Sequence, residues 1–343
     1  MRLKKSVLFV YVDFISFVKM DYKILSEKYQ VTKYKYKLSK NLFIFLFEFI
    51  KMSLYLIKNI YKFDLLYCWF AGYHTLLPTF FFRIFRKESI VIIGGYDAAK
   101  VPELNYGAHT KKIYGWFVKR TADFATNLLT VSKFTQTEFF KYVNCKNKIK
   151  TKMIYNGVDI NIFRRNYNVK KEKNIITVCG ASDIRTVLRK GVDFFVQVAF
   201  ELPHYKFKIY GLEEEAYRYI SKEKPKNLEI FHRISHSKLI NEFSKAKVAC
   251  QFSRYEAFGV AILEAMCCEC IPIGYDYGGT SEVINNSGYL IPELNSKHAA
   301  KCIEKAINSN NSIGKKVRQE SIKNFSFEKR EKEIMLLLKN LLN

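Results

Sequence analysis

The sequence predicts an α/β protein of two domains, each with its own parallel sheet. The chain has 343 residues, and domains commonly hold on the order of 150 residues each. Short β-rich runs alternate with helical runs along most of the chain, which is typical of βαβ units. The polar stretch at residues 164–173 (RRNYNVKKEK) separates two such series and is suited to be a linker.

The first series begins with residues 6–12 (SVLFVYV), an apolar run that meets Asp13. The run is too short for a signal peptide and predicts a buried first strand. The other elements expected in this half are a helix at 18–28, strands at 65–69, 89–93 and 128–131, and a helix at 135–143.

Residues 42–57 (LFIFLFEFIKMSLYLI) are the most apolar stretch of the chain. The stretch contains Glu48 and Lys51 and is shorter than the roughly 20 residues of a bilayer-spanning helix. It predicts a helix with two alternative roles. One is a core helix of the first domain, and the other is a helix that lies in a membrane interface. Lysines near the stretch favour the second role: Lys40, Lys51, Lys58 and Lys62.

The second series follows the linker and ends in a helical tail. Ser326 is a candidate N-cap for a last helix that reaches residue 342. We therefore expect domains at residues 1–165 and 166–325 and a C-terminal helix at 326–343. The elements expected in the second domain are strands at 175–179, 206–210, 228–231, 248–252 and 271–273, and helices at 192–201, 238–244 and 260–266.

The charge is unevenly distributed. The formal net charge is +25; residues 1–165 hold 29 basic and 11 acidic residues, and residues 166–343 hold 28 and 21. A/T-rich codons encode the abundant Lys, Asn, Ile, Phe and Tyr, so genome composition is one explanation. The other explanation for the positive charge is an anionic partner, such as membrane lipid, a phosphorylated substrate or nucleic acid. An apolar content of 49% excludes intrinsic disorder.

Residues 180–191 (GASDIRTVLRKG) form the first candidate site, directly after a predicted strand. A glycine at a strand end, followed by cations and a helix start, suits a diphosphate. The order of residues is neither that of a Walker loop nor that of a dinucleotide-binding fingerprint. A solvated basic loop is the alternative interpretation.

Residues 254–266 (RYEAFGVAILEAM) form the second candidate site. Phe258, Gly259 and Val260 open a helix whose first amides can bind an anion, and Gly259 permits close approach of a ligand. Glu256 in the loop and Glu264 further down the helix suit sugar or ribose hydroxyls. The alternative is that both glutamates are simply exposed to solvent. The apolar residues around them weaken this alternative, because they leave few positions that face solvent.

Residues 275–282 (YDYGGTSE) predict another strand-to-helix turn. Because the carboxyl ends of parallel strands meet at one edge of a sheet, we expect these three turns to lie together.

Cysteine spacing gives no metal signature. Three of the eight cysteines form Cys267-Cys268-Glu269-Cys270, and no second cluster follows. Zinc sites usually pair two such clusters or add spaced histidines. No Asp-x-Asp motif for a sugar-nucleotide metal is present either. We expect buried reduced thiols, no metal and no cofactor.

In order and spacing, these segments resemble motifs of the retaining family-4 glycosyltransferases, which have the GT-B fold. Residues 256–264, followed by Ala265-Met266, resemble the paired-glutamate motif of that family. In the first half, residues 94–97 (GGYD) look like an acceptor-side segment. The further matching segments are 131–134 (VSKF), 154–159 (IYNGVD), 190–193 (KGVD), 209–211 (IYG) and 278–282 (GGTSE).

The resemblance implies two Rossmann-like domains that face each other across a cleft. The first would bind the acceptor and the second the nucleotide-sugar donor, with the last helix crossing back to the first domain. Glu264 would hold the ribose and Glu256 the transferred sugar. Lys190, with Gly180 and an arginine nearby, would neutralise the diphosphate leaving group. The amides of the helix start would meet the sugar or phosphate: Phe258, Gly259 and Val260.

Two departures from the family pattern affect this assignment. The family arginine usually follows the strand's glycine directly, whereas here the candidates are Arg185, which we favour, and Arg189. Many members also place a histidine in the acceptor-side loop, where this chain has Asp97. His74 and His109 are further candidates there, although each also fits a structural or surface role.

The sequence therefore predicts a metal-independent retaining glycosyltransferase. Its donor would be a UDP, GDP or ADP sugar, and its acceptor a polysaccharide or a lipid-linked glycan. We expect a cytoplasmic protein, and peripheral contact with an anionic cytosolic membrane face is a further hypothesis.

Two alternative functions stay open. One is a GT-B-shaped sugar-nucleotide epimerase, although no histidine lies in the matching loops. The other is a non-catalytic protein that binds anionic membrane or nucleic acid. Nucleic acid is not an expected partner, because aromatic and basic residues are not interleaved as in single-strand modules.

Overall fold

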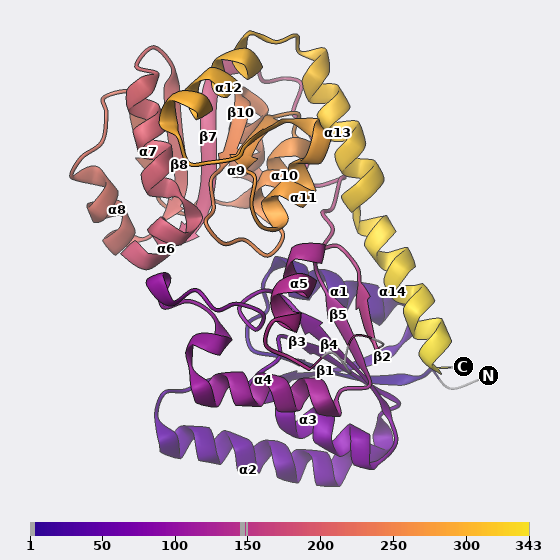
Figure 1. Ribbon diagram of the computed structural model, residues 1–343. Coiled ribbons are helices and arrows are strands. Elements are labelled where there is room, and N and C mark those ends of the chain that lie inside the picture. Colours follow the sequence, from indigo (N-terminus) through magenta and orange to yellow (C-terminus); the bar gives the residue numbers. More distant parts are fainter. Residues whose placement is uncertain (1–3, 145–147, 149, 343) are drawn as a thin grey trace. The chain divides into compact units, whose positions relative to one another are not determined.

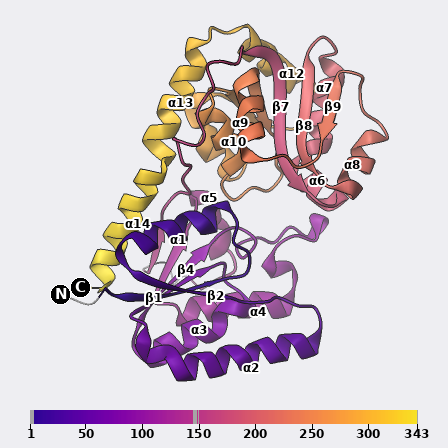
Figure 2. The same ribbon diagram turned by 180° about the vertical axis from the view of Figure 1, so that it is seen from behind.

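The computed structural model describes residues 4–144, 148 and 150–342. It forms two compact units, one of residues up to 156 together with those from 330 onward, and one of residues 157–329 (Figures 1 and 2). Within the described residues each unit contains one six-stranded sheet, and its paired strands run parallel. The predicted α/β architecture of two parallel sheets is confirmed.

The first sheet has the strand order β2-β1-β3-β4-β5-β6. Its central strands are buried and lack alternation, as expected for a parallel sheet with helices on both faces. The strands are β1 (Ser6–Tyr11), β2 (Gln30–Lys35), β3 (Leu65–Trp69), β4 (Glu88–Ile93), β5 (Asn127–Thr130) and β6 (Thr151–Met153). The helices are α1 (Ser16–Lys28), α2 (Leu42–Asn59), α3 (Tyr73–Ile84), α4 (Lys112–Phe124) and α5 (Lys133–Phe140).

The second sheet has the strand order β12-β11-β10-β7-β8-β9. Its strands are β7 (Glu172–Ala181), β8 (Lys206–Leu212), β9 (Leu228–Phe231), β10 (Ala246–Gln251), β11 (Ile271–Tyr275) and β12 (Tyr289–Ile291). The helices are α6 (Ile184–Lys190), α7 (Val192–Glu201), α8 (Glu214–Ser221), α9 (His236–Lys245), α10 (Val260–Cys267), α11 (Gly279–Ile284), α12 (Ser296–Asn308) and α13 (Ser312–Phe325).

The edge strands β2, β6 and β12 were not predicted from the sequence. Their residues are mostly half-buried or exposed, so they carry fewer apolar side chains than the central strands. A short edge strand pairs through its backbone on one side, and its sequence signal is correspondingly weak.

The predicted helix at 42–57 is α2, whose inner side packs on the apolar core through Met52 and Leu56, as the core-helix alternative requires, while most of its surface is not buried. Only Glu48, Met52 and Leu56 of this helix are buried. Figures 1 and 2 show α2, α3 and α4 on the same side of the first sheet, with α2 outermost. No described helix combines the length and apolarity that crossing a bilayer requires.

The last helix, α14 (Phe327–Leu342), is held in the first unit by a buried arginine. The Arg330 guanidinium donates to both carboxylate oxygens of Asp21, at 2.7 and 2.8 Å, and to the carbonyl of Tyr155 at 2.8 Å. The hydroxyl of Tyr67 donates to the same carboxylate. A buried ion pair needs such complete hydrogen bonding, so Arg330 specifies where the C-terminal segment packs.

Candidate functional site

The predicted donor-site residues come together at the carboxyl edge of the second sheet. β7, β10 and β11 are neighbours in this sheet, and the segments that follow them carry the candidate motifs. Behind this edge the strands and α7 pack into an apolar core. A rigid core below the loops holds side chains from distant parts of the sequence in one place.

Lys190 and Glu256 form the centre of this edge. The Lys190 ammonium lies 2.5 Å from a carboxylate oxygen of Glu256. The side-chain amide of Gln251 donates to the same oxygen at 3.0 Å. Burial favours the neutral form of Glu256, but the charges of Lys190 and Arg189 outweigh it and lower the pKa of this carboxyl. Glu256 is therefore an ionised carboxylate to which the hydroxyl groups of a ligand can donate hydrogen bonds.

Arg254 holds the two halves of this pair together, a role that the sequence analysis missed. Its guanidinium donates twice to the carboxylate of Asp193, both times at 2.7 Å, and also to the carbonyl of Leu188. The Arg254 amide donates to the carbonyl of Arg189. The loop of Glu256 is thereby clamped to the end of α6, where Lys190 lies. A signal was present in the sequence, because an arginine follows β10 and an aspartate follows Lys190-Gly191.

Glycines allow the loop that contains Glu256 to pack closely against neighbouring segments at two places. Gly191 has a φ of +67°, and a Cβ on it would lie 2.0 Å from the carbonyl oxygen of Phe252. A Cβ on Gly279 would lie 2.2 Å from the carbonyl oxygen of Ala257. The Gly279 amide donates to the carbonyl of Glu256 at 2.8 Å. The turn at residues 278–280 therefore supports the Glu256 loop from behind.

Glu264 lies in α10 among buried apolar residues of the same helix. It is 9% exposed, and no hydrogen bond to its carboxyl group is found within the described part of the chain. Burial raises its pKa from 4.5 to about 8. A buried carboxyl group without a partner is unfavourable for folding, so its retention fits a ligand-binding role.

The Glu264→Gln variant is expected to change how stability depends on pH. Because the folded pKa is raised, the contribution of Glu264 to stability is full below pH 4.5 and is lost as pH rises through about 8. Between pH 4.5 and about 8, the free energy of unfolding of the variant should therefore rise relative to that of wild type by up to about 1.4 kcal/mol per pH unit. Urea midpoints of both proteins at several pH values measure this. Parallel curves would contradict the assigned burial effect.

The other donor-site candidates line the same edge. Gly180 is exposed near the end of β7, and a Cβ built on it meets nothing within 4 Å. Gly259 has a φ of +101° and precedes Val260, the first residue of α10, whereas Phe258 is buried. Space at Gly180 and the amides of a helix start are compatible with a phosphate ligand.

The structure does not place Arg185 with the Lys190–Glu256 pair. Arg185 lies in the first turn of α6, exposed, and its guanidinium is 3.8 Å from the carboxylate of Asp183. The charge of Arg189, in contrast, contributes to the lowered pKa of Glu256. Arg189 is therefore nearer to the Lys190–Glu256 pair than Arg185 is. The assignment of Arg185 to the diphosphate stays a prediction.

Asp97 is fully buried in the first unit. Its carboxylate accepts hydrogen bonds from the amides of Ala71, Gly94 and Gly95, at 2.8 to 3.3 Å. Burial raises its pKa from 3.8 to about 6. These contacts order the loop after β4 and favour a positioning role over the predicted catalytic contact, which stays a prediction.

The two other acceptor-side candidates, His74 and His109, are buried and half-buried, respectively. His74 is buried and lies 2.8 Å from the carbonyl of Trp69, and burial lowers the pKa of each ring to about 4. Both rings are therefore neutral at physiological pH, as structural histidines usually are.

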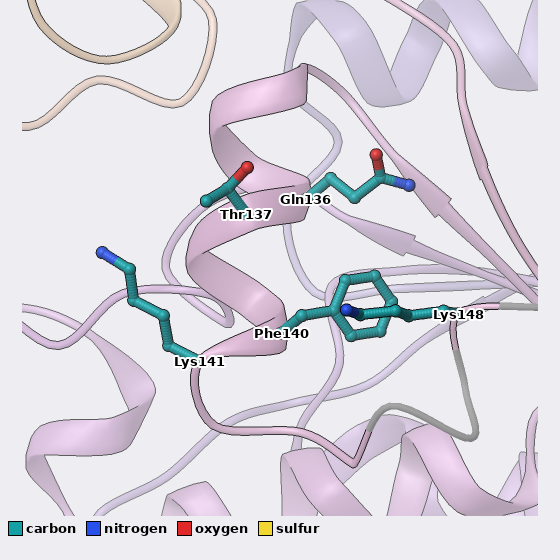
Figure 3. A pocket seen from close by; sticks show the side chains of 5 residues that line it. All are labelled: Gln136, Thr137, Phe140, Lys141 and Lys148. Carbon is teal, nitrogen blue, oxygen red and sulfur yellow. The ribbon is translucent and has the colours of Figure 1, made fainter.

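A hollow of about 470 Å³ lies along α5 in the first unit (Figure 3). It is lined by Gln136, Thr137, Phe140, Lys141 and Lys148. Lys148 lies over the Phe140 ring, 5.7 Å from its centroid, and Lys141 pairs with Glu138. The lining offers two lysines, one amide and one hydroxyl group, but none of these residues belongs to the predicted site.

The described cysteines are free and buried, including Cys267, Cys268 and Cys270. Burial raises the pKa of these three thiols. They are core side chains of the second unit, as the sequence analysis expected.

The family described as "Glycosyl transferases group 1" matches residues 159–325. The chain is also 30% identical, over 169 residues, to an Arabidopsis thaliana protein that is named as one subunit of phosphatidylinositol N-acetylglucosaminyltransferase. That alignment covers 46% of this chain and 36% of the relative, so the chain spans about a third of the length of this curated relative.

Two solved structures share the fold over nearly the whole chain. HepE of Anabaena, solved with UDP and glucose, is similar with a TM-score of 0.75 at 16% identity, covering 98% of this chain and 99% of that one. Sucrose-phosphate synthase of Thermosynechococcus elongatus is similar with a TM-score of 0.79 at 15% identity, with the same coverage. The chain therefore has the GT-B fold of these structures, and its residues 159–325 match the glycosyl transferases group 1 family.

Proposed function

We propose that the chain transfers a sugar from a nucleoside diphosphate sugar to a hydroxyl group of a polysaccharide or lipid-linked glycan, with retention of configuration. The observation that carries the proposal is the Lys190–Glu256 pair at the sheet edge, where Gly180 lies near the end of β7 and Gly259 precedes α10, with Glu264 further along that helix. A fixed cation, an ionised carboxylate and a helix start are what a sugar diphosphate requires.

The transfer breaks the bond between the anomeric carbon and the diphosphate oxygen. Negative charge then grows on the leaving diphosphate, and in this proposal the Lys190 ammonium stabilises it. The acceptor oxygen forms the new bond on the same face of the sugar and gives up its proton to the departing phosphate oxygen. Glu256 accepts hydrogen bonds from sugar hydroxyls, which orients the ring for attack.

The nucleoside is held further along α10. In this proposal Glu264 accepts hydrogen bonds from the ribose hydroxyls, which replaces the missing partner of a buried carboxyl group. UDP is the first nucleotide to examine, because HepE was solved with UDP. The relative from Arabidopsis carries a lipid substrate in its name, which supports the lipid-linked alternative for the acceptor.

Thermal unfolding with UDP, GDP and ADP, each with and without EDTA, tests the proposal. One nucleotide should raise the midpoint selectively and equally in EDTA, since a ligand at about 100 times its Kd adds about 2.7 kcal/mol of stability. Glu264→Ala should reduce this shift. The absence of a shift with all three nucleotides would contradict donor binding, and a shift abolished by EDTA would contradict the metal-independent mechanism.

A further inference from the structure

The outward face of α2 is an apolar stripe. Its side chains follow the spacing i, i+3, i+4, i+7, i+11 and i+14, which places them on one side of a helix. They are between 46% and 82% exposed. We call this surface the α2 stripe: Phe43, Leu46, Phe47, Ile50, Leu54 and Ile57.

Packing in the first unit does not explain the stripe. The opposite side of α2 anchors the helix through Met52 and Leu56, which belong to the apolar core. Glu48, the acidic residue of α2, also lies on this inner side, where its carboxylate is 3.4 Å from the Lys51 ammonium. A surface helix in water has the reverse arrangement. An apolar patch of this kind on a protein surface marks an interaction site.

The surroundings of the stripe are cationic. Residues 33–62 contain seven lysines and one acidic residue, the buried Glu48. Lys51 and Lys58 project from one flank of the helix, and Lys40 and Lys62 are exposed near its two ends. Apolar side chains bordered by lysines complement a lipid surface that carries negative headgroups.

α4 packs beside α2. It contacts α2 through Phe117 and Phe45, whose ring centroids are 6.4 Å apart. It also exposes Ile113 and Trp116. Tryptophan is enriched at the boundary between lipid and water.

We propose that α2 docks the protein on an anionic membrane, with the helix lying in the plane of the interface and the stripe inserted below the headgroups. The lysines would then lie at the level of the lipid phosphates. A second copy of the chain is a poorer occupant, because a two-fold contact pairs a surface with itself and would bring the lysine flanks together. This inference is independent of the proposed transferase function.

Co-sedimentation of the full chain with vesicles tests the proposal. Wild type should bind vesicles of equal parts phosphatidylcholine and phosphatidylglycerol, and should bind pure phosphatidylcholine more weakly. The triple variant Phe47→Gln, Ile50→Gln, Leu54→Gln keeps the charge and removes apolar contacts, so its partitioning should fall by at least about tenfold.

A matched control removes three exposed apolar side chains elsewhere, through Ile162→Gln, Phe200→Gln and Leu336→Gln. Circular dichroism confirms that both variants are folded, and the control should bind vesicles like wild type. Equal binding by the α2 variant and wild type would overturn the proposal. A wild-type dimer that the α2 variant alone converts to monomer, with vesicle binding unchanged, would instead assign the stripe to a second copy.

Discussion

Lys190→Ala is expected to lower the rate of sugar transfer about 100- to 1000-fold, which is the loss seen when one preorganised donor to a developing negative charge is removed. The Lys190 ammonium lies 2.5 Å from Glu256, so it is already fixed before the donor arrives. Its loss also removes the largest charge that lowers the pKa of Glu256, which should rise. Release of nucleoside diphosphate from the preferred donor measures the effect.

Two controls separate catalysis from folding. Lys190→Arg keeps the positive charge and should retain part of the rate. If Lys190 had only a structural role, the differently shaped arginine would not be expected to restore the rate. Lys301→Ala changes an exposed lysine of α12 and should leave the rate unchanged. A wild-type rate in Lys190→Ala would exclude its role at the diphosphate.

The same assay decides between the two arginines. The assignment of Arg185 predicts a larger loss of rate for Arg185→Ala than for Arg189→Ala. The opposite order would reassign the diphosphate contact to Arg189, whose charge reaches Glu256.

Gly191→Ala is expected to destabilise the second unit by about 2 to 4 kcal/mol. The residue has a φ of +67°, and a Cβ would lie 2.0 Å from a backbone oxygen that cannot move without shifting the end of β10. Relief of this clash would separate Lys190 from Glu256, so transfer should be lost as well. Urea denaturation measures the change in stability.

Gly180→Ala is the matched control for this prediction. A Cβ there meets no atom within 4 Å, so the stability should change by no more than about 0.5 kcal/mol. If the open space is the donor surface, nucleotide affinity should fall in this variant although the fold is intact. Wild-type stability of Gly191→Ala would show that the α6–α7 junction does not require glycine.

Much of the second unit was predictable from the sequence. Its central strands are buried on both faces and appear as mostly apolar runs, such as IITVC at residues 175–179. The glycine and glutamate motifs lie where those strands end, so their common edge follows from parallel topology alone. The family resemblance then assigned roles to Glu256, Glu264 and Lys190.

The sequence by itself determined the α/β class, the central strands and the identity of the polar groups at the sheet edge, because hydrophobic periodicity and turn residues are local signals. Only the tertiary structure decided which groups meet. The clamp from Arg254 to Asp193 joins residues 61 positions apart, and Arg330 reaches Asp21 across 309 positions. The outward direction of the α2 stripe was decided in the same way, since an apolar helix can face a core or a membrane, and its packing on α3 and α4 selects the side that remains exposed.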